Sequence, residues 1–505
     1  MIIARPPSRA RFWSPEAEPM TLQQTSRLRV VIIGGGFSGA SLAWQLAELQ
    51  VHANVTVVEP RSQLGRGLAY SSAEAVHRIN VPAHRMTMDP ERREDFLEWL
   101  LEAEADGSLP PDPESVTALG ERFPRREVFG RYVGERLAPH LATGRIRHVR
   151  ARVSDIERTP DGSLVLMLSD ESRIRADILV LATGHPAPAV PRPVAGLTGS
   201  PRLIADPYDP VRLAELDRDA RILVMGAALT SADVVATLDR LGHRGRITCI
   251  SRHGLRSRGH GQITKDSQVD FTDPPIHSAS ELLRRVRHAV VDDQAQGQSW
   301  HATFFRLRAQ GPQIWATLDA ENRARLLRHL RTLWDVHRYR LAPQVEAVLN
   351  RLIAEERLEY VAGHLLSAEK QEDALDIVWR PRGSLRERRE RFDAVIVTTG
   401  PAQGRCIDWN PALGALARLG LITPDPLGLG LATTQTCHAV DAGGAASQRI
   451  LIAGPLARGH IGELVGAPEC AIQVSSIARE IARQALLAPI LRPAAVAHGP
   501  AANPY

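Results

Sequence analysis

Short apolar runs alternate along the chain with segments whose apolar residues recur every three or four positions. Residues 30–33 and 55–58 are β-branched runs of the kind found in buried parallel strands. Between them, Leu42, Leu46 and Leu49 are spaced as on one face of a helix. The pattern predicts a strand-helix-strand unit whose two strands are parallel.

A later segment repeats this order. Residues 222–225 form an apolar run, a glycine turn follows, and Val234, Leu238 and Leu241 recur at helical spacing before a further strand at 247–251. The chain is therefore predicted to be an α/β protein with two similar cores.

A shorter sequence pattern also occurs twice in the chain. Residues 177–184 and 393–400 each consist of an aspartate, an apolar strand and a terminal Thr-Gly pair. The shared order predicts that both cores end a strand in the same way.

The turn after the first strand carries the spacing Gly34-x-Gly36-x-x-Gly39, with Phe37 and Ser38 between the last two glycines. In dinucleotide-binding folds the first glycine makes the turn, the second admits a pyrophosphate, and the third lets the helix pack closely on the strand. Glu59 ends the second strand, where a carboxylate can bind a ribose hydroxyl. Strand, helix and acid together favour a dinucleotide site over an ordinary glycine-rich turn.

The second core has a degenerate version of this motif, Gly226-x-Ala228-x-x-Ser231. Arg252 occupies the position that corresponds to Glu59, and a guanidinium matches a ribose phosphate in charge and geometry. This favours NADPH at the second site. The alternative is a solvated arginine on a purely structural unit.

The amino-acid composition argues against several other classes of protein. The chain of 505 residues has a net charge of +5, and its basic residues are scattered without aromatic partners, which argues against nucleic-acid binding. Its four cysteines are dispersed, which argues against a disulfide framework or a metal site and favours a cytoplasmic protein. No apolar run reaches the length of a membrane span, and Met20 is an alternative start that would lie closer to the first strand.

Longer segments carry a family resemblance. They are residues 65–70 (GRGLAY), 78–86 (RINVPAHRM), 123–132 (FPRREVFGRY), 334–338 (WDVHR) and 454–459 (GPLARG). In these segments the chain resembles the bacterial FAD/NAD(P)-binding flavoproteins that include FAD-dependent urate hydroxylase and nitrosuccinate-forming aspartate N-monooxygenase. The resemblance implies FAD at Gly34, Gly36, Gly39 and Glu59, with Phe37 and Ser38 in the same turn. It also implies that Asn80 lies near the flavin as a catalytic residue and that Thr183 and Gly184 close the FAD site.

Two Rossmann-like dinucleotide-binding domains are therefore expected, with the NAD(P)-binding domain inserted into the FAD-binding one. The predicted boundaries are a disordered N-terminus at 1–26, the first part of the FAD domain at 27–205, the NAD(P) domain with a helical insertion at 206–350, a return to the FAD domain at 351–485, and a flexible tail at 486–505. The sequence departs from the wider class at Gly454, where many members carry an acid that contacts the flavin's ribityl chain.

The expected function is an FAD-dependent, NAD(P)H-consuming monooxygenase acting on a small molecule. The chain has no Cys-x-x-Cys pair, which excludes the dithiol reductases that share two nucleotide domains and leaves molecular oxygen as the electron acceptor. The first choice of reaction is hydroxylation of urate. N-oxygenation of a small amino acid such as aspartate is the alternative, and a non-catalytic FAD/NAD(P)-binding sensor is the alternative of another class.

Several histidines fall in or beside the family-like segments: His77, His84, His185 and His337. A single histidine near a motif is more often a hydrogen-bonded structural residue than a general base, so none is assigned a catalytic role. His260 and Lys265 could form a basic patch for an anionic substrate, although a solvated loop is the simpler interpretation.

Overall fold

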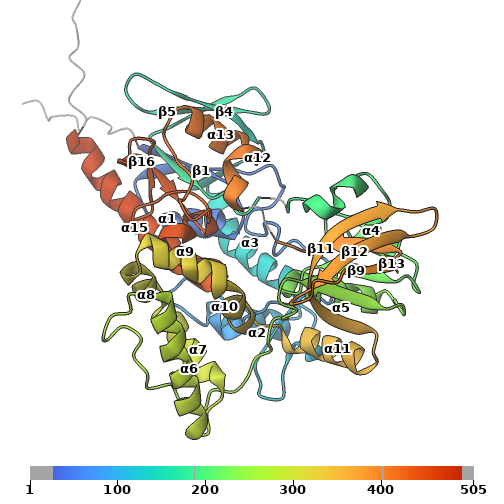
Figure 1. The fold of residues 1–505 in the computed structure, drawn as a ribbon. Coiled ribbons are helices and arrows are strands. Elements are labelled where there is room, and N and C mark those ends of the chain that lie inside the picture. Colours follow the sequence, from blue (N-terminus) through green and yellow to red (C-terminus); the bar gives the residue numbers. More distant parts are fainter. Residues whose placement is uncertain (1–26, 187, 401–402, 492–505) are drawn as a thin grey trace, which may run out of the picture.

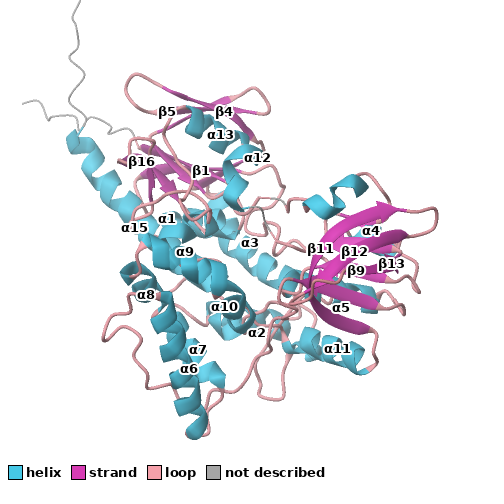
Figure 2. Cartoon of the chain, viewed as in Figure 1, coloured by secondary structure: helices cyan, strands magenta, loops and turns pink. Residues whose placement is uncertain are grey.

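The computed structural model describes residues 27–186, 188–400 and 403–491, so the predicted disordered segment 1–26 lies outside the described residues. Figure 1 shows three parts: an N-terminal α/β domain, a second α/β domain, and a lobe built only from helices. Figure 2 shows that strands are confined to the first two parts. The predicted tail at 486–505 is helical at its start, because α15 (Ala467–Leu491) continues to residue 491.

The first domain is built on a six-stranded sheet with the order β15-β16-β7-β1-β2-β3. Its strands are β1 (Leu28–Ile33), β2 (Ala53–Val58), β3 (Ile146–Val149), β7 (Ile178–Leu181), β15 (His438–Val440) and β16 (Ala446–Ile452). All neighbours are parallel except β15 and β16. Helix α1 (Phe37–Glu48) connects β1 to β2, which confirms the predicted unit.

The second domain is built on a seven-stranded sheet with the order β13-β12-β11-β10-β9-β14-β8. Its strands are β8 (Leu203–Ile204), β9 (Ile222–Met225), β10 (Ile247–Ser251), β11 (Leu358–Lys370), β12 (Leu375–Pro381), β13 (Arg388–Phe392) and β14 (Ala394–Val397). Helix α5 (Leu229–Arg240) joins β9 to β10, as predicted, and α4 (Pro210–Ala214) and α11 (Pro343–Ala354) belong to the same domain. Strands β12 and β13 are antiparallel, and β13 forms one edge of the sheet.

Two domain boundaries differ from those predicted. Strands β11 to β14 pair within the second sheet, although residues 351–485 were expected to return to the first domain. Strand β8 also joins the second sheet, by pairing with β14, so this domain begins before residue 206. The return to the first sheet comes with β15 and β16, because only there does the chain pair with β7 again.

The helical lobe comprises α6 (Ala279–Ala295), α7 (Trp300–Ala309), α8 (Gly311–Thr317), α9 (Ala320–His329) and α10 (Arg331–Arg338). Phe271, Ile276 and Ile314 belong to its own apolar core. The lobe docks on the C-terminal part of the first domain, where Trp315 donates from Nε1 to the carbonyl oxygen of Gly459 at 3.0 Å. A helical segment was predicted from about residue 318 to 352, and it is divided into α9, α10 and α11.

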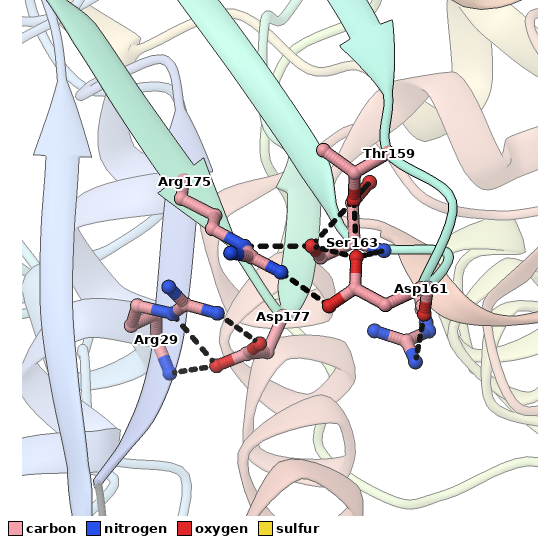
Figure 3. A network of polar contacts seen from close by, with 7 residues as sticks. Arg29, Thr159, Asp161, Ser163, Arg175 and Asp177 are labelled. Atoms are coloured by element: carbon pink, nitrogen blue, oxygen red, sulfur yellow. Dashed lines mark hydrogen bonds and ion pairs between the residues drawn. The ribbon is translucent and has the colours of Figure 1, made fainter. Parts of the chain in front are cut away.

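A small antiparallel sheet lies against the first domain. Its strands are β4 (Val153–Arg158), β5 (Leu164–Leu168) and β6 (Arg173–Ala176). Figure 3 shows that a polar network holds its turns, with Arg175 donating from Nε to Ser163 Oγ at 2.8 Å. In the same view Arg29 of β1 donates from its backbone nitrogen to Asp177 Oδ2 at 2.9 Å and from Nη2 to Asp177 Oδ1 at 2.6 Å. This pair joins the end of β6 to the first strand of the chain's main sheet.

The remaining helices cover the first domain: α2 (Asp95–Ala105), α3 (Arg126–Ala142), α12 (Cys406–Trp409), α13 (Pro411–Arg418) and α14 (Arg458–Ile461). Buried residues of β1 are divided between two apolar clusters, with Val30 and Ile32 on one and Val31 and Ile33 on the other. Alternate residues of a strand point to opposite faces, so the sheet is covered on both sides. Among the residues that the structure describes, no helix is both long and apolar enough to span a membrane.

Candidate functional site: a dinucleotide cavity and a second nucleotide fold

A cavity of about 730 Å³ opens beside the turn between β1 and α1. Its volume is in the range of cofactor sites. Of the eight residues predicted for FAD, the cavity is lined by all except Gly39: Gly34, Gly36, Phe37, Ser38, Glu59, Thr183 and Gly184. The structure thus brings together residues from the ends of β1, β2 and β7, at the edge where parallel strands present their carboxyl ends.

The three glycines of the turn meet different constraints. Gly34 has a φ of +101°, and a Cβ there would lie 2.4 Å from the carbonyl oxygen of Ala182. A Cβ at Gly39 would lie 1.9 Å from the carbonyl oxygen of Gly34, which explains why Gly39 packs behind the turn and not on the cavity. At Gly36 the nearest atom to a Cβ is the Gly67 Cα at 3.7 Å, so a side chain would find room only by filling the cavity.

Glu59 is held at the cavity wall by the backbone. Its side chain is 5% exposed, Oε2 accepts the N–H of Gly35 at 2.9 Å, and Oε1 accepts the N–H of Arg61 at 3.0 Å. Arg61 Nη1 also donates to Oε1 at 3.4 Å. An ionised carboxylate has about four acceptor positions, so these three bonds leave capacity for a ribose hydroxyl. The buried acid therefore fits the predicted role.

The N-terminus of α1 is left open to the cavity. Its N-cap Gly36 makes no side-chain capping bond, and the first turn carries no acidic residue. By contrast, α6, α9 and α13 are capped by Ser278, Asp319 and Asn410. Free N–H groups at a helix N-terminus bind phosphate oxygens. The cavity wall also carries four arginines that the motif did not predict as ligands: Arg61, Arg66, Arg126 and Arg152.

One of these arginines connects the cavity to the second domain. Arg126 donates from Nη1 and Nη2 to Asp233 of α5 at 2.8 and 2.9 Å, and Tyr208 donates to the same carboxylate at 3.3 Å. Both charged side chains of the pair are largely buried. Because 107 positions separate the two residues, no local sequence pattern indicated this pair.

The residues predicted for NAD(P) lie at the corresponding turn of the second domain. Gly226 has a φ of +133°, Ala228 is the N-cap of α5 without a side-chain bond, and the first turn of α5 has no acidic residue. Ser231 is fully buried and donates from Oγ to the carbonyl oxygen of Ala228 at 2.7 Å. Arg252 is exposed directly after β10. Gly226, Ala228 and Ser231 therefore lie at the N-terminus of α5, and Arg252 follows the neighbouring strand β10.

The repeated Asp-strand-Thr-Gly pattern has a structural counterpart. Strand β7 pairs with β1 and β14 pairs with β9, each in parallel register. Asp177 Oδ2 accepts the backbone N–H of Arg29, and Asp393 Oδ2 accepts that of Arg221 at 2.7 Å. Each aspartate thus fastens its strand to the neighbouring parallel strand, β1 in the first domain and β9 in the second.

Asn80 does not belong to the lining of the cavity. Its Oδ1 accepts the N–H of Ala342 at 3.2 Å, and its carbonyl oxygen accepts a hydrogen bond from His260 Nε2 at 3.1 Å. The side chain therefore links the 78–86 segment to the start of α11. This geometry gives Asn80 a positioning role, while contact with a flavin stays a prediction.

Gly454, where the sequence lacks the acid of related flavoproteins, has a φ of +79°. A Cβ there would lie 2.4 Å from Ser38 Oγ, and the Gly454 N–H is donated to Gln473 Oε1 at 2.6 Å. Because Ser38 lies so close to the backbone of Gly454, a side chain at this position would clash with it.

The histidines beside the motifs occupy hydrogen-bonded or buried positions. His77 Nδ1 lies 2.7 Å from Ser72 Oγ, and its Nε2 lies 3.1 Å from Thr237 Oγ1. Burial lowers the pKa of His84 and of His337, and it lowers the pKa of His185, on the cavity wall, to about 4. The lowered pKa values of these rings disfavour their charged form at neutral pH.

His260 and Lys265, considered above as a possible basic patch, lie in different environments. Burial and the charge of Arg340 lower the pKa of His260 to about 4, whereas Lys265 is exposed and its backbone bonds to Gln298. Within the described part of the chain, no group of three or more His, Cys, Asp or Glu side chains is arranged to hold a metal ion.

Comparisons with known proteins bear on the cofactors and on the fold. Residues 31–186 match a family model described as FAD-NAD(P)-binding. No curated protein shows significant sequence similarity to the chain.

Among solved structures, the reduced form of ornithine hydroxylase from Pseudomonas aeruginosa superimposes with a TM-score of 0.61 at 15% identity, covering 91% of this chain and 100% of that one. L-lysine 6-monooxygenase from Pseudomonas syringae gives 0.61 at 17% identity, covering 90% and 99%. Ornithine N-hydroxylase from Kutzneria sp. 744, with reduced FAD, NADP⁺ and L-ornithine, gives 0.59 at 16% identity, covering 90% and 99%.

At these identities the likeness establishes the fold. The family match confirms the predicted cofactor classes, FAD and NAD(P)H. The chain thus has an FAD-NAD(P)-binding domain at residues 31–186 and, over nine tenths of its length, the two-domain α/β fold of flavin monooxygenases.

Proposed function

We propose that this chain is an FAD-dependent, NAD(P)H-consuming monooxygenase that oxygenates the amine of a small amino acid. The observation that carries the proposal is the fold correspondence, which extends over about 90% of the chain to enzymes named for hydroxylating ornithine or lysine. The cavity beside α1 supports it, because its residues suit FAD. The alternative derived from the sequence, N-oxygenation, thus has more support than urate hydroxylation, which none of these neighbours favours.

The cysteines support oxygen as the electron acceptor. Cys249, Cys406, Cys437 and Cys470 are all buried and free, and no two of them form a Cys-x-x-Cys pair. Only Cys470 lines the cavity, and burial raises the pKa of its thiol to about 12. A protonated thiol is a poor nucleophile, so dithiol exchange has no partner here.

The residues present fit the two cofactors. Glu59 and the open end of α1 would hold the ribose and pyrophosphate of FAD, and Ala228 with Arg252 would hold NADPH. When bound, FAD supplies hydride acceptance and oxygen activation, which amino-acid side chains cannot provide. The Arg126–Asp233 pair would keep the second nucleotide domain aligned with the FAD cavity.

The proposal is tested with the purified, FAD-loaded protein. NADPH and NADH are first added without oxygen, and flavin absorbance is followed. Fast bleaching is expected and would reject the non-catalytic sensor. Oxygen uptake is then measured with ornithine, lysine, aspartate and urate, and products are identified by mass spectrometry. An N-oxygenated amino acid is the expected product, whereas stimulation by urate alone would refute the proposal.

A further inference from the structure

The helical lobe contains a second cavity, of about 160 Å³, where it meets the C-terminal part of the first domain. We call it the lobe cavity. Its wall is mostly apolar, with side chains from α6 to α10 that include Leu282, Phe304, Ile314, Trp315, Leu327 and Trp334. Figure 1 shows these helices gathered in one lobe. An apolar cavity of about 150 Å³ holds a benzene ring, so the lobe cavity has room for one ring or one branched chain.

Helix α9 covers the lobe cavity without closing it tightly. Leu326 and Leu327 line the cavity, yet no residue of α9 is fully buried. Leu333 of α10, also on the cavity wall, is 40% exposed. A close-packed core leaves few voids larger than a water molecule. Half-buried leucines around a space of this size therefore indicate room for an apolar ligand.

The wall of the lobe cavity also carries a buried arginine without a partner. Arg458, the first residue of α14, lines the cavity and is 8% exposed. Among the residues that the structure describes, its side chain forms no hydrogen bond or ion pair, and its Nε is buried without an acceptor. Burying an unpaired charge is costly, because nothing replaces the lost hydration. This position therefore favours an anionic ligand.

The other three charged side chains on the wall are paired within the protein. Glu463 lies 2.9 Å from Arg338 Nη2, and Asp335 lies 3.5 Å from Arg331. Burial raises the pKa of Asp335, although the charges of Arg331 and Arg458 oppose the rise. Asp335 is therefore not a strong counter-ion for Arg458, and one positive charge is left on the cavity wall.

The segment 454–467 lies between the lobe cavity and the FAD cavity. Pro455 and Ala467 line the FAD cavity, whereas Arg458 lines the lobe cavity. The charge of Arg458 also adds to burial in lowering the pKa of His185 on the wall of the FAD cavity. A ligand bound to Arg458 is therefore expected to alter flavin absorbance.

We propose that the lobe cavity binds a small apolar monocarboxylate, with its ring or branched chain among the leucines and its carboxylate on Arg458. A planar guanidinium matches a carboxylate in bidentate geometry, and one unpaired positive charge matches one carboxylate. Tyr339 is a further donor on the wall, because burial raises the pKa of its hydroxyl and keeps it protonated. This binding site goes beyond the oxygenation proposed above and does not depend on it.

The site is tested with three probes and the FAD-loaded protein. Phenylacetate has the ring and the carboxylate, 2-phenylethanol has the ring alone, and acetate has the carboxylate alone. Each is titrated while heat, flavin absorbance and tryptophan fluorescence are recorded, because Trp315 and Trp334 line the cavity. Phenylacetate is expected to bind and to raise the melting temperature. The other two probes should bind at least about tenfold more weakly.

Three variants locate the ligand. Arg458→Gln should weaken phenylacetate binding by about ten- to a hundredfold, and it should leave the affinity for 2-phenylethanol unchanged. It should not lower the melting temperature of the ligand-free protein, because Arg458 has no partner to lose in the described structure. Leu327→Trp fills the cavity and should abolish binding of both ring compounds. Arg328→Gln, at an exposed arginine on α9 without an ion pair in the described structure, is the matched control and should leave binding unchanged.

Specific outcomes overturn the site. Equal phenylacetate affinity in the wild type and in Arg458→Gln, with circular dichroism unchanged, would refute the role of Arg458. Binding of 2-phenylethanol as tight as that of phenylacetate would refute the carboxylate assignment. Phenylacetate binding that persists in Leu327→Trp would place the ligand outside the lobe cavity. If Arg458→Gln fails to fold, the comparison of the probes in the wild type and in Leu327→Trp still decides between these outcomes.

Discussion

The two strand-turn-helix units place different residues where the helix packs against the turn. In the first unit, Gly39 allows the helix to approach so closely that a Cβ would lie 1.9 Å from the carbonyl oxygen of Gly34. In the second unit Ser231 occupies the equivalent position, and its hydroxyl bonds to the carbonyl oxygen of Ala228. A buried side chain at this position requires a wider separation of helix and turn. The close approach is therefore a property of the first unit, not of the fold in general.

The middle positions of the two glycine motifs, Gly36 and Ala228, have similar backbone conformations although the residues differ. Gly36 has φ and ψ of −67° and −172°, and Ala228 has −97° and −159°. Both are extended conformations that any residue can adopt, so alanine at the second site carries no backbone strain. Both helices also begin without a side-chain cap. The degenerate second motif thus retains the backbone conformation of the first, as the predicted pyrophosphate site requires.

The largest expected effect comes from filling the first turn. Gly36→Val would place methyl groups in the cavity, where the nearest described atom to a Cβ is the Gly67 Cα at 3.7 Å. The fold should survive, while FAD affinity should fall at least about a hundredfold, or roughly 3 kcal/mol. Flavin absorbance of the purified protein, normalised to protein concentration, measures the loss.

Gly134→Val is the matched control for this substitution. Gly134 lies on α3, and a Cβ there would meet no atom within 4 Å. Full FAD content in the control, with loss in Gly36→Val, would locate the cofactor at the first turn. Normal FAD content in both variants would show that the cavity is not the FAD site.

A smaller and more selective effect is expected at the second turn. Ala228→Val should raise KM for NAD(P)H by about tenfold, because the added methyl groups approach the position of the pyrophosphate. FAD content should not change, because Ala228 lies on the other domain. Anaerobic flavin reduction at varied NAD(P)H concentration gives the measurement. A variant that loses FAD but retains its affinity for NAD(P)H would reverse the assignment of the two units.

Local sequence patterns predicted both units because each feature lies within a short segment. The strands are uninterrupted apolar runs, and the turns carry glycines at Gly34 and Gly226 that need positive φ angles. The Thr-Gly pattern was visible for the same reason. Features that depend on one segment only could therefore be predicted well.

The boundary error has a physical cause. Strand β13 reads RRERF and lies at the edge of its sheet, where most of its side chains are exposed. An edge strand needs no apolar run, so its sequence gives no sign of the sheet it joins. Strands β11 and β12 follow the helical lobe in sequence, and only hydrogen-bond register shows that they extend the second sheet.

Contacts between residues far apart in the sequence could not be predicted from local patterns either. Arg126 and Asp233 form a buried ion pair between domains, although 107 positions separate them. Asn80 was placed near the flavin by resemblance, whereas its side chain bonds to Ala342. Such pairs depend on how the domains and the helical lobe pack, which no periodicity records.

The smallest expected effect distinguishes the charged residues that end the second strand of each unit. Glu59 is buried and bound to two backbone N–H groups, whereas Arg252 is exposed. An exposed charge contributes modestly to binding, so Arg252→Gln should raise KM for NADPH by roughly fivefold. KM for NADH should not change, because NADH lacks the ribose phosphate. The ratio of the two KM values measures the effect, and increasing salt should reduce it in the wild type. If Arg252→Gln changes both KM values equally, the arginine does not bind the ribose phosphate of NADPH. The difference between Glu59 and Arg252 would then not explain a preference for NADPH over NADH.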